Sequence, residues 1–267
     1  MVDYSALRRK KLFLFDLDGT LYLGDRLFDG VCELLSLIRA RGGQYRFLTN
    51  NSSRSVGAYV QKLTRLGVTA EESDFLTSVD ALTYYLREHG GEDKRYYVCG
   101  TESMKSQLRA AGFAIAEGRA DADALLMGFD TELTFQKLED ACILLGQGVP
   151  YIVTNPDWVC PTSYGFVPDC GSVCEMLWRA TNRRPVVIGK PEPLMPQLAM
   201  REAGASVRET LLVGDRIYTD IASGANAGID TLLVLSGETK SEDLPTAVPQ
   251  PTFVLPDVQA LRSILES

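Results

Sequence analysis

The sequence predicts an α/β protein with a mainly parallel sheet. Apolar, β-prone runs alternate with segments of helical periodicity along the chain, which is the pattern of strands joined by helices. Several of the runs are apolar throughout rather than alternating, as expected when helices cover both faces of a sheet. The predicted strands are residues 12–15, 45–48, 96–98, 124–127, 151–153, 186–188, 211–213 and 232–235.

The segments between these strands carry apolar residues at helical spacing. In residues 31–40, the apolar side chains at positions 31, 34, 35 and 38 share one face of a helix. Residues 56–66 and 135–145 show the same spacing. Residues 238–256, by contrast, are rich in proline and charge, so we expect a surface loop there.

Composition and charge restrict the classes of partner. The chain has 267 residues, of which 45% are apolar and 23% charged, an ordinary globular composition. The formal net charge of -8 opposes attraction to nucleic acid or anionic lipid, so we expect neither as a partner. No apolar stretch reaches the length of about 18 residues that a membrane span needs. The short apolar run near the start ends at two aspartates, which indicates a buried strand rather than a signal peptide and favours a cytoplasmic location.

The cysteines and the histidine offer little chemistry. None of the six cysteines is spaced as CxxC, and reduced thiols suit a cytoplasmic protein. A zinc site from Cys160, Cys170 and Cys174 is conceivable, but their spacing departs from the common patterns and we favour free thiols. The one histidine, His89, precedes two glycines in a helical pattern, and no serine or cysteine motif accompanies it. A triad hydrolase is therefore disfavoured.

Polar clusters follow four of the predicted strands. They are FLFDLDGT, RFLTNNS, VVIGKPEP and LLVGDRIYTD. Ligands of open α/β sheets bind at the carboxyl ends of the strands, so these clusters can assemble one site. The long interval between Asn50 and Lys190 has room for an inserted domain.

The first cluster places two carboxylates at the end of an apolar strand. Asp16 and Asp18 are two residues apart, and side chains at that spacing in a strand point the same way. Two like charges in one site call for a cation. Gly19 allows the backbone to turn and approach a ligand closely. The alternative, a turn with solvated aspartates, is disfavoured because the cluster directly follows the apolar run FLF.

Together the four clusters give the chain a family resemblance. In order and spacing, FDLDGTLY, LTNNS, GKPEP and GDRIYTD resemble the motifs of the haloacid dehalogenase-like (HAD-like) hydrolases, and within them the NagD-like phosphatases. The resemblance implies a doubly wound, Rossmann-like core of residues 1–78 and 184–267. It also implies a smaller inserted α/β cap domain, residues 79–183, that sets substrate specificity and excludes water on closing.

The resemblance also implies the roles of the main site residues. Asp16 is the expected nucleophile, which attacks phosphorus and becomes an aspartyl-phosphate. Asp18 is the expected general acid and then general base. Lys190 would neutralise the charge of nucleophile and phosphate. The expected cofactor is Mg²⁺, held by the Asp16 carboxylate, the Asp18 backbone carbonyl and the Asp215 carboxylate.

Further residues are assigned weaker roles. The Thr49 hydroxyl and the Asn50 amide can donate to phosphate oxygens, whereas Ser52 and Ser53 are better explained as a turn or helix cap. Asp220 is expected to support the metal site from behind the ligands or to reach a metal-bound water. Its alternative is a plain residue at the N-terminus of a helix.

The predicted cap contains a segment that resembles the substrate-contacting part of the family. Asn155 and Asp157 match its NPD pattern and are candidate substrate-binding residues. A glycine-rich stretch of the family reads PDCGS here, at residues 168–172, which puts substrate specificity in doubt. Residues 155–176 are expected to form a surface loop at least as far as residue 172. The cap is also a candidate surface for a homodimer.

The function predicted from the sequence is a Mg²⁺-dependent phosphatase for small phosphomonoesters such as sugar phosphates or nucleotides. A non-catalytic phosphometabolite-binding protein on the same fold is one alternative. The presence of Asp16, Asp18, Lys190 and Asp215 argues against it, because a sensor needs no nucleophile. A phosphomutase is a second alternative that the residues leave open. A dehalogenase is disfavoured, because it would need neither Asp18 nor a metal.

Overall fold

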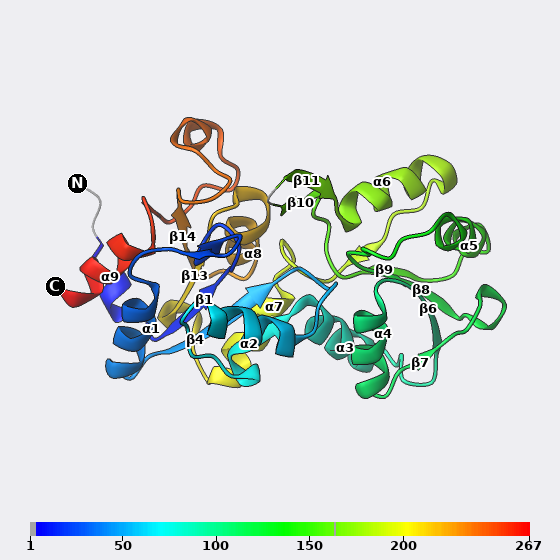
Figure 1. Cartoon of the computed structure of the whole chain (residues 1–267), viewed down its shortest axis with the longest axis horizontal. Helices are drawn as coiled ribbons and strands as arrows, with labels where there is room; N and C mark the ends of the chain where they lie inside the picture. The colour runs from blue at the N-terminus through cyan, green and yellow to red at the C-terminus, as the bar shows by residue number, and fades with distance from the viewer. Residues whose placement is uncertain (1–3, 163) are drawn as a thin grey trace. The chain divides into compact units, whose positions relative to one another are not determined.

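The computed structural model describes residues 4–162 and 164–267, which form two compact units (Figure 1). The first unit comprises Met1–Thr49, Tyr59–Leu76 and Lys190–Ser267. The second comprises Asn50–Ala58 and Thr77–Gly189. The domain roles and boundaries predicted from the sequence, a catalytic core and a specificity cap, stay a prediction.

The first unit is built on a six-stranded sheet with the strand order β15-β14-β13-β1-β4-β5. The pairs that join β15, β14, β13, β1 and β4 are parallel. The predicted α/β class is thus confirmed. The strands are β1 (Leu12–Phe15), β4 (Gln44–Thr49), β5 (Phe75–Thr77), β13 (Thr210–Gly214), β14 (Asp230–Val234) and β15 (Phe253–Leu255).

Helices cover both faces of this sheet. The chain moves from β1 to β4 in one direction and from β4 to β13 and on to β14 in the other. Right-handed crossovers therefore put α1 on one face and α7 and α8 on the other. Helix α9 packs against α1. The helices are α1 (Val31–Ala40), α2 (Val56–Arg65), α7 (Leu194–Ala203), α8 (Ala222–Asn226) and α9 (Val258–Glu266).

The second unit has a five-stranded sheet of its own, in the order β12-β9-β8-β6-β7, with every neighbouring pair parallel. Helix α3 packs against α4, and α5 packs against α6. The elements are α3 (Ser78–Glu88), β6 (Arg95–Cys99), α4 (Glu102–Ala110), β7 (Ala114–Ile115), β8 (Ala124–Met127), α5 (Phe135–Gly146), β9 (Tyr151–Val153), α6 (Cys170–Thr181) and β12 (Val186–Val187).

Two short hairpins and several helical turns complete the chain. The hairpins are β2 (Tyr22–Leu23) with β3 (Arg26–Leu27) and β10 (Val159–Thr162) with β11 (Gly165–Pro168), both antiparallel. The 3₁₀ turns are Leu7–Arg9, Glu72–Asp74, Arg119–Asp121, Val207–Glu209 and Ser241–Thr246, and Ile217–Ile221 is a π-helical turn.

The run at 186–188 forms a strand as predicted, β12, which pairs with β9 in the second sheet. Two other sequence-based predictions about elements were wrong. The expected loop at 238–256 contains β15, because the apolar residues after the prolines pair in parallel with β14. The expected loop at 155–176 contains the β10–β11 hairpin and the start of α6. Each error concerns a short apolar run, whose partner strand is a long-range property that local pattern does not reveal.

The cysteines are unpaired with one another, as expected. All six cysteines are free thiols, and the Cys170 and Cys174 sulfurs are 4.0 Å apart. In the part of the chain that the structure describes, no helix has the length and apolar character that crossing a bilayer requires.

Candidate active site

The site lies at β1, where the chain changes the direction in which it adds strands to the first sheet. Strand β1 lies between β13 and β4, and the chain winds away from it in both directions. Such a switch point opens a crevice beyond the carboxyl ends of the strands. Asp16 is the first residue after β1, and its N–H donates to the Val213 carbonyl at 2.9 Å. This bond continues the parallel ladder and fixes where the carboxylate begins.

Lys190 joins two carboxylates in this crevice. Its Nζ donates to Asp16 Oδ1 at 2.6 Å, to Asp220 Oδ1 at 2.7 Å and to the Leu48 carbonyl at 3.4 Å. The Lys190 side chain is only 3% exposed. A buried ammonium is stable only when oxygen acceptors surround it, and here carboxylates and a carbonyl supply them.

Asp215 is the first residue after β13, the strand beside β1. Its Oδ2 accepts the Glu238 N–H at 2.7 Å, and its Oδ1 accepts the Thr20 hydroxyl at 3.5 Å. Gly19 and Gly237 both lie so close that an added Cβ would overlap the Asp215 carboxylate. The carboxylate is therefore clamped between two backbone segments that have no side chain at the point of contact.

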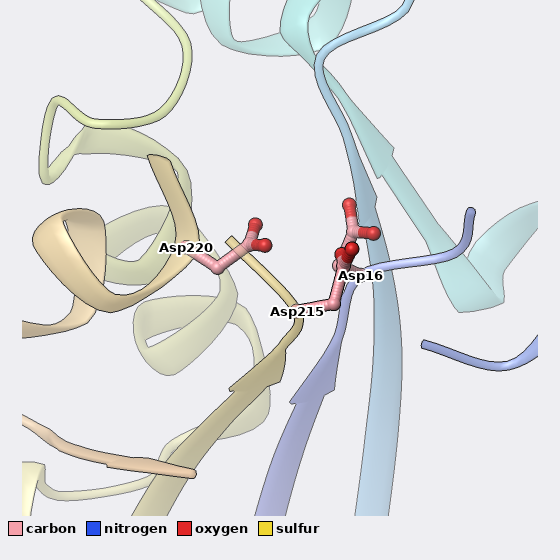
Figure 2. Close-up of side chains that lie close together, drawn as sticks. All are labelled: Asp16, Asp215 and Asp220. Atoms are coloured by element: carbon pink, nitrogen blue, oxygen red, sulfur yellow. The ribbon is translucent and has the colours of Figure 1, made fainter. Parts of the chain in front are cut away.

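Asp220 enters from the π-helical turn Ile217–Ile221 (Figure 2). Both of its oxygens have protein donors, since Oδ1 accepts from Lys190 and Oδ2 accepts the Arg216 N–H at 3.1 Å. Gly214 permits this approach, because a Cβ there would overlap the Asp220 side chain. Asp220 thus orients Lys190, and its expected role behind the metal ligands stays a prediction.

Asp16, Asp215 and Asp220 can each offer one oxygen such that the three atoms lie within 4.8 Å of one another (Figure 2). Among the described residues this is the one cluster of His, Cys, Asp or Glu of that kind, and Cys160, Cys170 and Cys174 are not brought together in this way. A cluster of carboxylate oxygens is the donor set of a hard cation such as Mg²⁺. The chemistry of the donors therefore fits the expected ion.

Comparison with known proteins shows the same family along the chain. Residues 13–114 match the family described as haloacid dehalogenase-like hydrolase, and residues 187–261 match one described as HAD-hydrolase-like. The 5′-nucleotidase YutF of Bacillus subtilis is 36% identical over 249 residues, 93% of this chain and 96% of that protein. The chain belongs to the haloacid dehalogenase-like hydrolases.

Further matches refine its place in the family. An acid sugar phosphatase of Staphylococcus haemolyticus is 31% identical over 97% of this chain and 98% of that protein. Solved structures of a 4-nitrophenylphosphatase from Thermotoga maritima and of a protein assigned as nagD share 37% and 36% identity, with TM-scores of 0.93 and 0.89. Both matches cover 98% of this chain, and they cover 100% and 99% of those chains. The hydrolase is therefore NagD-like, as its motifs predicted.

One related structure contains a metal. The glycerol phosphate phosphatase of Mycobacterium tuberculosis, solved in complex with magnesium, is 30% identical to this hydrolase with a TM-score of 0.90. The match covers 98% of this chain and 78% of that one.

The electrostatics of the hydrolase site also call for a cation. Burial raises the pKa of the Asp16 carboxyl well above its ordinary value; Lys190 opposes the shift, and the charges of Asp220 and Asp215 add to it. Burial, followed by the charge of Asp220, raises the pKa of Asp215 from 3.8 to about 7. Burial alone would lower the pKa of Lys190, but Asp16 and Asp220 outweigh it and raise that pKa. One ammonium does not balance three buried carboxylates.

Asp18 lies near Asp16 in the chain but has a different environment. Its side chain is 41% exposed, and its carboxylate contacts Tyr22 and Lys62. The Tyr22 hydroxyl is 3.2 Å from Oδ2, and the Lys62 ammonium is 3.6 Å from Oδ1. Burial, and then the nearby charge of Asp18, raise the pKa of Tyr22, so its hydroxyl keeps its proton.

Thr49 and Asn50, expected together at the phosphate, fall in different units. Thr49 is the last residue of β4, whereas Asn50 belongs to the second unit. There its amide donates to Asp157 Oδ2 at 2.8 Å, and Asn155 donates to the same oxygen at 2.9 Å. Asn50, Asn155 and Asp157 are all buried. The three form a rigid hydrogen-bonded network, and their roles toward substrate stay predictions.

The reading of Ser52 as a turn or cap residue was wrong. Its hydroxyl is fully buried in the second unit, where it accepts the Phe129 N–H at 2.9 Å and the Thr154 hydroxyl at 3.1 Å. Ser53 does form a turn, in which its N–H and its hydroxyl donate to Asn51 Oδ1 at 2.9 Å and 2.7 Å.

Sequence reasoning missed several residues that shape the site. Thr20, Tyr22 and Gly237 position Asp215 or Asp18, and Lys62 reaches Asp18 from α2. Tyr22 carried a usable signal, because it closes the DLDGTLY motif four residues after Asp18. Lys62 and Gly237 carried no such signal in the sequence, because only the tertiary fold brings them to Asp18 and Asp215.

The raised pKa of Asp215 predicts how pH affects the stability of the metal-free protein. The folded state keeps Asp215 protonated up to about pH 7, whereas the unfolded chain ionises near the ordinary value of 3.8. The folded state therefore holds the extra proton, and its stabilisation is lost as pH rises through that interval. We expect a lower Tm at pH 8 than at pH 5 in excess chelator.

Asp215→Asn isolates this contribution from other titrating groups. In chelator at pH 8 the variant should melt above the wild type by about 2–4 °C, the shift that roughly 1 kcal/mol gives a chain of this size. Mg²⁺ should raise the wild-type Tm more at pH 8 than at pH 5, because its ligands must be deprotonated. An identical pH dependence of Tm in the two metal-free proteins would contradict the assignment.

The clamp on Asp215 gives a second prediction. Gly237→Ala should displace the Asp215 carboxylate and weaken Mg²⁺ binding by at least about tenfold, measured as the Mg²⁺ concentration for half-maximal activity. Gly118→Ala is the matched control, since Gly118 has extended backbone and an added Cβ there meets no atom within 4 Å. Equal Mg²⁺ requirements in the two variants would show that Asp215 needs no clamp.

Proposed function

We propose that this hydrolase is a Mg²⁺-dependent phosphatase that cleaves small phosphomonoesters through an aspartyl-phosphate on Asp16. The observation that carries the proposal is the contact of Lys190 Nζ with Asp16 Oδ1 at 2.6 Å, inside a cluster of three carboxylates. An ammonium at that place favours the ionised form of the nucleophile and faces the charge that a phosphoryl group brings. A lysine that served only as a structural salt bridge to Asp16 would not need Asp215 and Asp220 beside that pair.

In the first step an Asp16 oxygen attacks phosphorus. The new P–O bond to Asp16 forms as the bond to the leaving oxygen breaks, and Asp18 gives its proton to that oxygen. In the second step Asp18 takes a proton from water, whose oxygen attacks phosphorus and displaces Asp16. Inorganic phosphate is released, and both aspartates return to their starting states.

The remaining residues manage charge and position. Lys190 offsets the charge of Asp16 and the phosphoryl group, and Asp220 keeps the ammonium in place. Mg²⁺, held by the Asp16 carboxylate, the Asp18 carbonyl and the Asp215 carboxylate, would supply the positive charge that the phosphoryl oxygens require. Thr49, at the end of β4, is proposed as a phosphate donor, and Asn50 as a second donor.

The class of substrate follows from the relatives and from the chemistry of the site. The similar proteins are described as a 5′-nucleotidase, an acid sugar phosphatase, a glycerol phosphate phosphatase and a 4-nitrophenylphosphatase. Their substrates share one group, a phosphate monoester on a small alcohol. A site made of carboxylates and an ammonium recognises that shared group and leaves the rest of the substrate to other residues.

The proposal is tested with Asp16→Asn, which should retain below about one percent of wild-type turnover because an amide is a poor nucleophile. The measurement is free phosphate from several unrelated phosphoesters. Acid-quenched wild type should also carry a phosphoryl group on the peptide that contains Asp16. Asp25→Asn, an exposed aspartate at the β2–β3 turn, is the control and should keep its activity.

Two outcomes would contradict the proposal. Turnover well above that level in folded Asp16→Asn would exclude the covalent route. Transfer of phosphate between positions of a substrate, without release of free phosphate, would identify a phosphomutase instead.

We also propose that the second unit is the cap and that its β10–β11 hairpin selects substrates. The hairpin and the residue before it present aromatic side chains to solvent: Trp158 is 51% exposed, Phe166 68% and Tyr164 82%. Exposed aromatic residues that lie this near one another in the chain mark a candidate binding surface. Asp157 and Asp169, in contrast, are buried and hydrogen-bonded, so changing them would report on the folding of this unit.

Tyr164→Ala should change the ratio of kcat/KM values among a nucleotide, a sugar phosphate and glycerol phosphate by about tenfold, while 4-nitrophenyl phosphate changes less. Phe135→Ala is the control, since Phe135 on α5 of the same unit is 80% exposed. A uniform loss across all substrates would mean that Tyr164 has a structural role only.

Location and assembly remain proposals of the same kind. Six free thiols support a cytoplasmic location, in a reducing compartment. A homodimer through the second unit is supported by its exposed apolar side chains, Phe135 and Phe166 among them, and would be detected by light scattering.

A further inference from the structure

The carboxylate of Asp18 has a different partner on each oxygen. The Tyr22 hydroxyl donates to Oδ2 at 3.2 Å, and the Lys62 ammonium lies 3.6 Å from Oδ1. Tyr22 is fully buried, and the Lys62 side chain is 15% exposed. Asp18 itself is 41% exposed, so packing alone would leave its carboxylate free to rotate. A hydrogen bond on one oxygen and an ion pair on the other restrict that rotation.

Tyr22 and Lys62 also contact each other. The Lys62 ammonium lies over the Tyr22 ring, 3.8 Å from its centroid. The three side chains therefore form a closed set in which each touches the other two. The cation–π contact holds the ammonium beside Asp18 even though a lysine side chain is otherwise flexible.

The backbone places Tyr22 for this contact. The Gly19 N–H donates to the Tyr22 carbonyl at 2.8 Å, and Asp18 and Tyr22 form an isolated bridge. A tight turn thus brings residue 22 back beside residue 18. Burial fixes the ring, so the hydroxyl projects from the core of the first unit toward the carboxylate. Lys62 arrives from α2, a distant part of the chain in the same unit.

We propose that Tyr22 and Lys62 are positioning residues that hold the Asp18 carboxyl where it can transfer a proton to the leaving oxygen. The inference rests on the proposed function, in which Asp18 is the general acid. Proton transfer requires the carboxyl within hydrogen-bond reach of that oxygen, and a small misplacement lowers the rate by orders of magnitude. Both residues act on the reaction through their contacts with the Asp18 carboxyl.

Two substrates of similar shape that differ strongly in the acidity of the leaving group test this role. Phenyl phosphate and 4-nitrophenyl phosphate have similar shape, but 4-nitrophenolate leaves readily without a proton and phenolate does not. At saturating Mg²⁺, Tyr22→Phe should lower kcat/KM for phenyl phosphate by at least about tenfold, and for 4-nitrophenyl phosphate by less than about threefold. Lys62→Met should act in the same direction, and Lys62→Arg should restore part of the loss.

Controls separate this inference from the proposed function. Asp18→Asn should show the same substrate split, and a larger one, because it removes the acid itself. Tyr45→Phe, a buried tyrosine near the start of β4, should show no split. A split in Asp18→Asn but equal losses on both substrates in folded Tyr22→Phe and Lys62→Met would overturn the positioning role. No split in Asp18→Asn would instead overturn its assignment as general acid.

Discussion

The site depends on one buried ammonium. Lys190 contacts Asp16 and Asp220, residues that are 174 and 30 positions away from it in the chain. Without it, carboxylates from the ends of β1 and β13 and from the π-helical turn would face one another in a region almost closed to water. Like charges so placed raise one another's pKa or force the site apart. The same interaction fixes the Asp16 carboxylate, orients Asp220 and connects the chain at residue 190 to the first sheet.

Topology explains why such a cluster can form at all. The carboxyl ends of β13, β1 and β4 lie side by side because the sheet reverses its winding at β1. The ends of β1 and β13 bring Asp16 and Asp215 together, and glycines at positions 19, 214 and 237 allow the approach of the carboxylates. The arrangement leaves an excess of negative charge. Stability is given up at this point so that a metal ion and a phosphoryl group can be bound, a common compromise at catalytic sites.

The pattern of apolar and polar residues along the chain predicted the strands and the residues that directly follow them. All eight β-prone runs became strands, and the aspartates after β1 and β13 lie together as expected. Other features depend on contacts that a single sequence does not display. The apolar run before Lys190 could pair with either sheet, and it pairs in the second. Asn155 and Asp157 lie in a loop, as the sequence suggests, but they are buried there and hydrogen-bonded to each other.

In the proposed mechanism, Asp16 and Asp18 give one strand end two kinds of chemistry. Asp16 is largely buried and paired with an ammonium at 2.6 Å, which suits a carboxylate that must stay ionised and attack phosphorus. Asp18 is partly exposed and contacts a phenol and a more distant ammonium. A group that gives up a proton and later takes one from water needs access to solvent and a fixed direction rather than a strong ion pair. The two roles are therefore set by the partners of each residue, because the side chains themselves are chemically identical.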